Sequence, residues 1–170
     1  MQLAEKRGIK EPQLWTLLGA ALKQEGDFDN AVDAWRKALK IDSSHQEALE
    51  NWAAHEAECG SKKVAIRLFE RIVDINPTHA EARMHLGILL RQDGQLKRAT
   101  EHLKISAELN NTDWVAQFNY ATHLQQLGRT TEALEYLQKA QSLNPNLERD
   151  IKEHMHDKNT GSETMGNSNR

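Results

Sequence analysis

Hydrophobic and small residues recur along this chain at intervals of three and four, which is the spacing of one face of a helix. The first such stretch is followed by Gly26, and a second begins at Phe28. Glycine favours a helix end because it adopts a left-handed conformation without a side-chain clash. The pattern therefore predicts two helices joined by a short turn. Their expected buried faces are Leu14, Trp15, Leu18, Gly19 and Leu22 in the first, and Phe28, Ala31, Val32, Trp35, Ala38 and Leu39 in the second.

This pair of patterns occurs four times with a period of 34 residues. No residue is inserted between successive repeats, which are 12–45, 46–79, 80–113 and 114–147. Agreement over several columns is too regular for chance, so the repeat decides the architecture. The matching columns are Gly26, Gly60, Gly94 and Gly128; Ala31, Ala65, Ala99 and Ala133; Trp35, Phe69, Leu103 and Leu137; Gly19, Ala53, Gly87 and Ala121; and Leu18, Trp52, Leu86 and Tyr120.

The spacing and residue types of this unit resemble the tetratricopeptide repeat (TPR). The stretches "WTLLGAAL", "AVDAW", "AIRLF", "INP" and "LNP" carry the resemblance. It implies an all-α fold, a right-handed α-solenoid in which antiparallel helix pairs stack around a concave groove, and it implies no chemistry. The departures are modest: Ser43 and Asn111 replace a junction proline, and Ile72 stands in a column of smaller residues. At the last junction, Asp113 before Trp114 predicts a helix N-cap.

The two ends of the chain fall outside the four repeats. Residues 1–11 are either an N-terminal extension or the remnant of a preceding helix, because Met1 and Ala4 continue the register backwards. Residues 148–158 place Ile151 and Met155 four apart on an otherwise polar stretch. Such a one-sided stripe predicts a capping helix that covers the last repeat. Residues 159–170 are rich in Gly, Ser, Thr and Asn, and they predict a disordered tail.

Charge and composition exclude several classes of partner. Lys and Arg number 22 against 25 Asp and Glu, for a net charge of −3, so nucleic acid is not expected as a partner. No apolar run approaches the length of a membrane span, and the first residues lack the hydrophobic core of a signal peptide. We therefore expect no membrane insertion. Cys59 is the single cysteine, which fits a reducing compartment and a cytoplasmic location.

The sequence shows no convincing catalytic set. His55 and Cys59 are four apart and share a helix face, but no third partner is placed beside them, and a structural role is favoured. His154 and His156 point to different faces of a helix and do not predict a metal site. A glycine-rich phosphate loop is absent as well. The prediction is a protein without catalytic residues, metal or cofactor.

In the TPR family the first helix of each repeat lines the concave groove, and this resemblance supplies the candidate site. Residues between the core columns of those helices are expected to face a partner. They combine polar positions in repeat two with apolar anchors in repeats three and four. The predicted groove residues are Glu50, Asn51, Met84, His85, Ile88, Arg91, Val115, Phe118, Asn119, Thr122 and Gln125.

The function expected from these features is a scaffold or adaptor that binds another protein, through an extended peptide or an amphipathic helix. Some TPR domains clamp the acidic C-terminus of chaperones with Lys, Asn and Arg. Here Glu47, Glu50 and Glu81 occupy such a groove and would repel a carboxylate. Two alternatives stay open. The chain is the regulatory or substrate-presenting part of a larger enzyme, such as a glycosyltransferase, or it self-associates, so a monomer or a weak homo-oligomer is expected.

Overall fold

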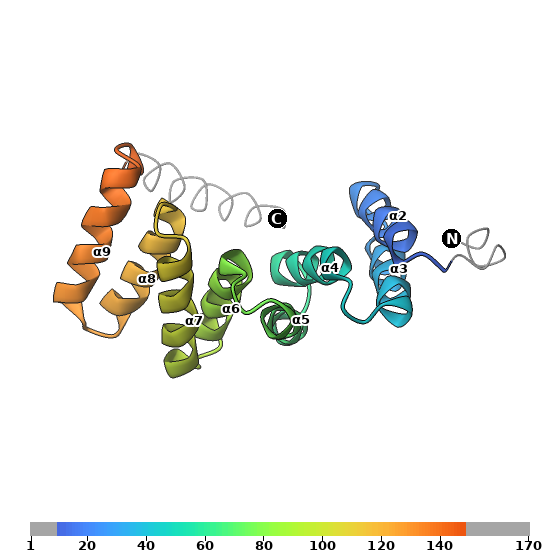
Figure 1. Ribbon diagram of the computed structural model, residues 1–170, viewed down its shortest axis with the longest axis horizontal. Helices are drawn as coiled ribbons and strands as arrows, with labels where there is room; N and C mark the ends of the chain where they lie inside the picture. Colours follow the sequence, from blue (N-terminus) through green and yellow to red (C-terminus); the bar gives the residue numbers. More distant parts are fainter. Residues whose placement is uncertain (1–9, 149–170) are drawn as a thin grey trace, which may run out of the picture. The chain divides into compact units, whose positions relative to one another are not determined.

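The computed structural model describes residues 10–148, which form helices and connecting turns (Figure 1). The chain divides into two compact units, Met1–Leu109 and Asn110–Arg170. The first contains α2 (Pro12–Gln24), α3 (Phe28–Ile41), α4 (Gln46–Glu58), α5 (Lys62–Ile75), α6 (Ala80–Gln92) and α7 (Leu96–Leu109), and the second contains α8 (Trp114–Gln126) and α9 (Thr130–Leu143). The all-α solenoid fold predicted from the repeat is confirmed. Residues 1–9, the tail 159–170 and the expected capping helix beyond residue 148 lie outside the described residues.

Glycine ends the first helix of three repeats in the way that the sequence predicts. Gly26, Gly94 and Gly128 have φ angles of 81°, 80° and 74°, in the left-handed region. After Gly26 the backbone N–H of Asp27 donates to the carbonyl oxygen of Leu22 at 2.9 Å, which closes the helix end. Gly60 is not in this conformation. The turn of the second repeat is therefore built differently from the other three.

A carboxylate organises that second turn. The side chain of Glu56 accepts hydrogen bonds from the backbone N–H of Ser61 at 2.7 Å and from Trp52 Nε1 at 2.8 Å. A Cβ atom on Gly60 would lie 2.9 Å from Cα of Glu56, so a close approach, and not a positive φ, explains glycine here. The same residue type in one repeat column thus meets two different physical requirements.

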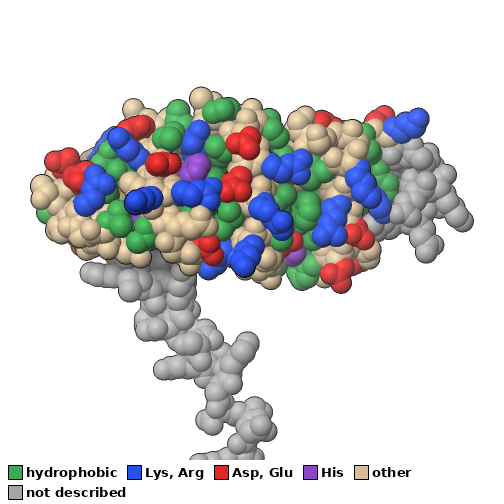
Figure 2. All heavy atoms as spheres, turned by 90° about the horizontal axis from the view of Figure 1, so that it is seen from below, with side chains coloured by type: hydrophobic (Ala, Val, Ile, Leu, Met, Phe, Trp, Pro, Cys, Tyr) green, Lys and Arg blue, Asp and Glu red, His purple; other side chains and the backbone are tan. Residues whose placement is uncertain are grey.

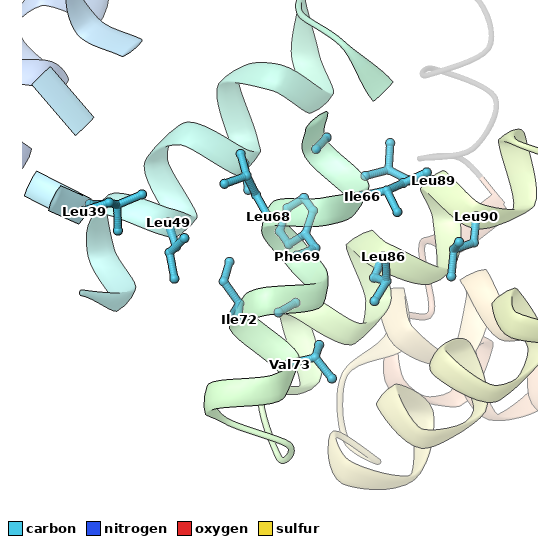
Figure 3. Packing of buried hydrophobic residues seen from close by; sticks show 14 of the residues in the cluster. Leu39, Leu49, Ile66, Leu68, Phe69, Ile72, Val73, Leu86, Leu89 and Leu90 are labelled. Atoms are coloured by element: carbon cyan, nitrogen blue, oxygen red, sulfur yellow. The ribbon is translucent and has the colours of Figure 1, made fainter. Parts of the chain in front are cut away.

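The core of the first unit is continuous from α2 to α7 and is centred on α5. In Figure 3, Phe69 and Ile72 of α5 lie between Leu49 of α4 and Leu86 of α6. All four side chains are buried, with exposed fractions between 0% and 4%. Helices α3 and α5 are thereby each held between the first helix of their own repeat and the first helix of the next. This packing fixes the spacing of the first helices, which carry the candidate site.

Two residues of the predicted buried faces are exposed, namely Leu14 at 45% and Phe28 at 46%. Leu14 has the same repeat position as Ala48 and Ala82, which are 0% and 2% exposed. In repeats two and three that helix face packs against the second helix of the preceding repeat. No such helix precedes α2 among residues 10–148. The prediction for Leu14 was wrong because it assumed a neighbour on both sides.

The second unit is one helix pair with its own packing. The Asp113 side chain accepts a hydrogen bond from the backbone N–H of Val115 at 2.9 Å, which confirms the predicted N-cap of α8. Tyr120 of α8 and Tyr136 of α9 meet edge to face, with ring centroids 4.7 Å apart. Leu124 is fully buried. This pair forms the fourth repeat.

Candidate partner-binding pocket

A pocket of about 340 Å³ opens between α4 and α6, with α5 beneath it. The first helices of repeats two and three provide most of its walls, because successive first helices have equivalent positions in the stack. Short side chains from these helices leave the space open. The lining residues are Glu50, Asn51, Ala54, Ala57, Glu58, Phe69, His79, Glu81, Ala82 and His85.

The inner wall of the pocket is apolar and aromatic. Phe69 is buried with 4% exposure, and its ring stacks on the imidazole of His85 with centroids 5.3 Å apart and an interplanar angle of 18°. Ala54 and Ala82 extend this surface along α4 and α6. A bound side chain would therefore meet carbon atoms below and an imidazole plane beside it, with polar groups at the rim.

His79 links the two walls through two different hydrogen bonds. As the N-cap of α6, its Nδ1 atom accepts from the backbone N–H of Ala82 at 3.3 Å. Its Nε2 atom lies 2.7 Å from Oε1 of Glu50. Because Nδ1 is the acceptor, Nε2 is the nitrogen that donates to the Glu50 carboxylate.

Carboxylates dominate the rim of the pocket. Glu50, Glu58 and Glu81 line it, and none of its lining residues is Lys or Arg. Lys23 reaches Glu58 from α2, with Nζ 2.8 Å from Oε2. Glu81 lies 3.8 Å from Nε2 of His85. Three carboxylates therefore share one nearby ammonium group, so the rim is acidic.

The acidic rim contrasts with the charge seen elsewhere on the molecule. Helix α4 contains four glutamates and no Lys or Arg. Many Lys and Arg side chains are visible on the face displayed in Figure 2, interspersed with Asp and Glu. The small net charge of the whole chain therefore conceals local differences, and the pocket is one of the acidic places.

The structure brings part of the predicted groove together. Glu50 and Asn51 of α4 and His85 of α6 line the pocket. Met84, Ile88 and Arg91 lie on the same helix as His85 and are half-buried, but they are not among the lining residues. Burial lowers the pKa of the Arg91 guanidinium from its ordinary value.

The remaining predicted groove residues belong to the second unit. Val115, Phe118, Asn119 and Thr122 of α8 are half-buried, and Gln125 is exposed. The side chain of Asn119 donates to the carbonyl oxygen of Val115 at 2.9 Å. Met84 and Ile88 are in the first unit, so a patch that joins them to Val115 and Phe118 stays a prediction.

Sequence reasoning did not select several residues of the pocket. Phe69 belongs to the column of Trp35 on the second helices, and His79 lies at the junction before α6, so both reach the pocket from outside the first-helix columns. Ala57 and Ala82 contribute by being small. The sequence feature that could have located the pocket is Ala57, because the same position in the first repeat holds Lys23. A change from a long side chain to alanine at one repeat position indicates where space opens.

A second cavity, of about 300 Å³, lies among α5, α6 and α7 and includes Glu70, Arg98 and His102. Two of its charges are already paired, since Arg98 forms an ion pair with Glu70. Burial is the main cause that lowers the pKa of His102, and the positive charges of Arg83 and Arg98 lower it further.

Little in the described residues indicates reactive chemistry. Sγ of Cys59 lies 3.4 Å from Nδ1 of His55, but the His55 ring packs against Phe28 and Trp35, with centroids 5.2 and 5.9 Å away. The structural role expected for His55 agrees with this packing. Between residues 10 and 148 no group of three His, Cys, Asp or Glu side chains is placed to hold a metal ion. None of the described helices has the length and apolar character needed to cross a membrane.

Comparison with known proteins begins with one curated relative. The peroxisomal targeting signal receptor of Saccharomyces cerevisiae is 24% identical over 88 residues. The match covers 52% of this chain and only 14% of that receptor, so the chain spans about one seventh of the relative's length.

Solved structures show the same fold at low sequence identity. A MamA RS-1 double mutant aligns with a TM-score of 0.77 and 23% identity, over 86% of this chain and 82% of the other. MamA residues 41 to the end from Desulfovibrio magneticus RS-1 align with a TM-score of 0.73 and 23% identity, over 83% and 80%. Models of the tetratricopeptide repeat match residues 12–45, 59–113 and 114–147. The chain belongs to the tetratricopeptide repeat family.

Proposed function

We propose that this chain is a non-catalytic interaction module that binds a segment of a partner protein in the pocket between α4 and α6. The observation that carries the proposal is the pocket itself, which combines an apolar inner wall at Phe69 with polar groups at Glu81 and Asn51. Pockets that bind ligands commonly combine an apolar lining with a few polar groups that orient the ligand. Helical groove walls suit an extended peptide or an amphipathic helix.

Two further facts support this proposal. TPR proteins bind other proteins, and one relative is named as a targeting signal receptor. We also propose that a bound segment extends along α6 towards Met84 and Ile88. Burial of each large apolar side chain contributes roughly 1.5–3 kcal/mol before the costs of association. A few such contacts with rim hydrogen bonds support affinity in the micromolar range.

The test uses a random peptide library displayed on phage and the full chain as bait. Peptides selected on the wild type are then measured against Ala54→Phe, which places a ring in the pocket mouth. Position 54 tolerates a larger side chain, since its equivalent in repeat three is Ile88. We expect at least about a tenfold loss of affinity, equivalent to about 1.4 kcal/mol.

Ala21→Phe is the matched control, because Ala21 is an exposed alanine on the first helix of repeat one and does not line the pocket. The selected peptides should bind this variant as tightly as the wild type. Circular dichroism should show equal helicity for both variants. Peptides that bind Ala54→Phe with unchanged affinity would show that partner recognition occurs elsewhere.

A further inference from the structure

We propose that the partner segment places an arginine side chain in the α4–α6 pocket, with its guanidinium group between the carboxylates of the rim and the imidazole of His85. This inference rests on the proposed function and assigns the chemistry of the bound segment. It is carried by three properties of the pocket: its charge, its aromatic wall and its apolar inner surface.

The charge of the pocket selects a cation. Glu50 of α4 accepts a hydrogen bond from His79, and Glu81 is an exposed carboxylate on the facing wall. Both of these carboxylates lack a Lys or Arg partner among the residues that line the pocket. A cationic side chain that enters this space gains attraction from both walls, whereas an acidic one is repelled.

The aromatic wall selects a planar cation. The imidazole of His85 stacks on Phe69, which holds the plane of the ring in place, and the His85 side chain is 43% exposed. Guanidinium is planar, stacks on aromatic faces and presents paired donors to a carboxylate. An ammonium group is a compact and strongly hydrated point charge, and it gains less from such a wall.

The inner surface fits the stem of the same side chain. Arginine carries its charge at the end of an apolar chain of three methylene groups, which packs on carbon surfaces while the head group remains at the rim. Ala54 and Ala82 supply that carbon surface, and the absence of longer side chains at these positions leaves it open. One residue type therefore satisfies every part of the pocket.

The direct test is a titration of the full, ¹⁵N-labelled chain with single-residue probes, followed by two-dimensional NMR. The probes are the N-acetyl methylamides of arginine, lysine, norleucine and glutamate. We expect the arginine probe to move backbone amide signals of α4 and α6 around the pocket at concentrations where norleucine and glutamate do not. Higher salt should weaken this effect, because the attraction is between charges.

Charge-neutral variants identify the responsible carboxylates. Glu50→Gln and Glu81→Gln should each weaken binding of the arginine probe at least about threefold, since each removes one carboxylate charge from the rim. Glu47→Gln is the matched control, because Glu47 is exposed on the same helix, accepts a hydrogen bond from Gln13 and does not line the pocket. It changes the net charge equally and should leave the titration unchanged.

The outcomes separate this inference from the proposed function. Equal shifts from the arginine and norleucine probes, or no shifts from arginine, would overturn the inference. Lysine as effective as arginine would overturn the stacking on His85. If library peptides lose affinity on Ala54→Phe but keep it when their arginines are replaced by glutamine, the pocket is the binding site and the arginine is wrong. If Ala54→Phe has no effect on those peptides, the proposed function itself fails.

Discussion

Two seams between neighbouring first helices, α2–α4 and α4–α6, are built from equivalent repeat positions and yet differ in their side chains. In the first seam Lys23 crosses from α2 to Glu58 of α4, and Gln13 crosses to Glu47 at 2.7 Å. Helices α2 and α4 are in direct contact. In the second seam the position of Lys23 is occupied by Ala57, which lines the pocket.

The histidines at the start of α4 and α6 show the same contrast. His79 caps α6 and donates to Glu50 across the second seam. His45 has the equivalent position in the first seam, where Thr16 replaces the glutamate, and its buried Nε2 atom has no hydrogen-bond partner in the structure. One backbone arrangement therefore supports either a closed, bridged seam or an open, acidic one. The choice depends on a few side chains at equivalent positions.

The largest expected effect concerns the aromatic side chain that packs under the first helix of a repeat. Trp35 is fully buried beneath α2, and a Cβ atom on Gly19 would lie 2.4 Å from its Nε1 atom. Gly19→Ala should therefore lower the free energy of unfolding by about 1–3 kcal/mol through overpacking, measured by urea denaturation. The second repeat pairs Ala53 with Phe69 at these positions.

Introducing the alanine–phenylalanine pair of the second repeat at positions 19 and 35 should restore the lost stability. Gly19→Ala with Trp35→Phe should be more stable than Gly19→Ala alone, because the smaller ring leaves room for the added methyl group. A double variant no more stable than the single one would mean that the two repeats are not equivalent at this contact.

A smaller effect should distinguish the two histidines. His79→Leu removes an N-cap and the donor to Glu50, so a loss of roughly 0.5–2 kcal/mol in unfolding free energy is expected. His45→Leu removes a buried polar atom without a partner and should be neutral or slightly stabilising. Thermal denaturation of both variants under one set of conditions makes the comparison. Equal losses would show that His79 contributes only by packing.

The smallest effect belongs to the bridge across the first seam. The Lys23 and Glu58 side chains are 32% and 62% exposed, so solvent screens their attraction. Lys23→Ala should lower stability by only about 0.2–1 kcal/mol, and the difference should shrink in high salt. The same variant should not affect peptides selected on the pocket. A large loss that persists in high salt would show that the lysine stem, and not its charge, holds α2 to α4.

Much of the fold was predictable from periodicity. The 34-residue columns placed small residues opposite large ones, and the structure shows Gly19 against Trp35 and Gly87 against Leu103. The exposure of Leu14 was not predictable by this route, because a column records an average environment and the first repeat lacks a described neighbour on one side.

The candidate site was predictable only in part. Glu50, Asn51 and His85 were found because they lie on first helices between core columns. Phe69 and His79 were missed because one comes from a second helix and the other from a helix junction, and only the stacking of α5 beneath α4 and α6 brings them to the same space. Whether Val115 and Phe118 contribute to binding stays a prediction for the second unit.

The sequence by itself determined the helix pairs, their ends and their small-to-large contacts, because these depend on residues close along the chain or one period apart. Only the tertiary structure decided which equivalent positions form a pocket. Whether a pocket is open depends on the length of the side chains that meet there from two helices one period apart. Its hydrogen bonding depends on which nitrogen of His79 faces Glu50. Those are properties of contacts in space, and a repeat pattern does not encode them.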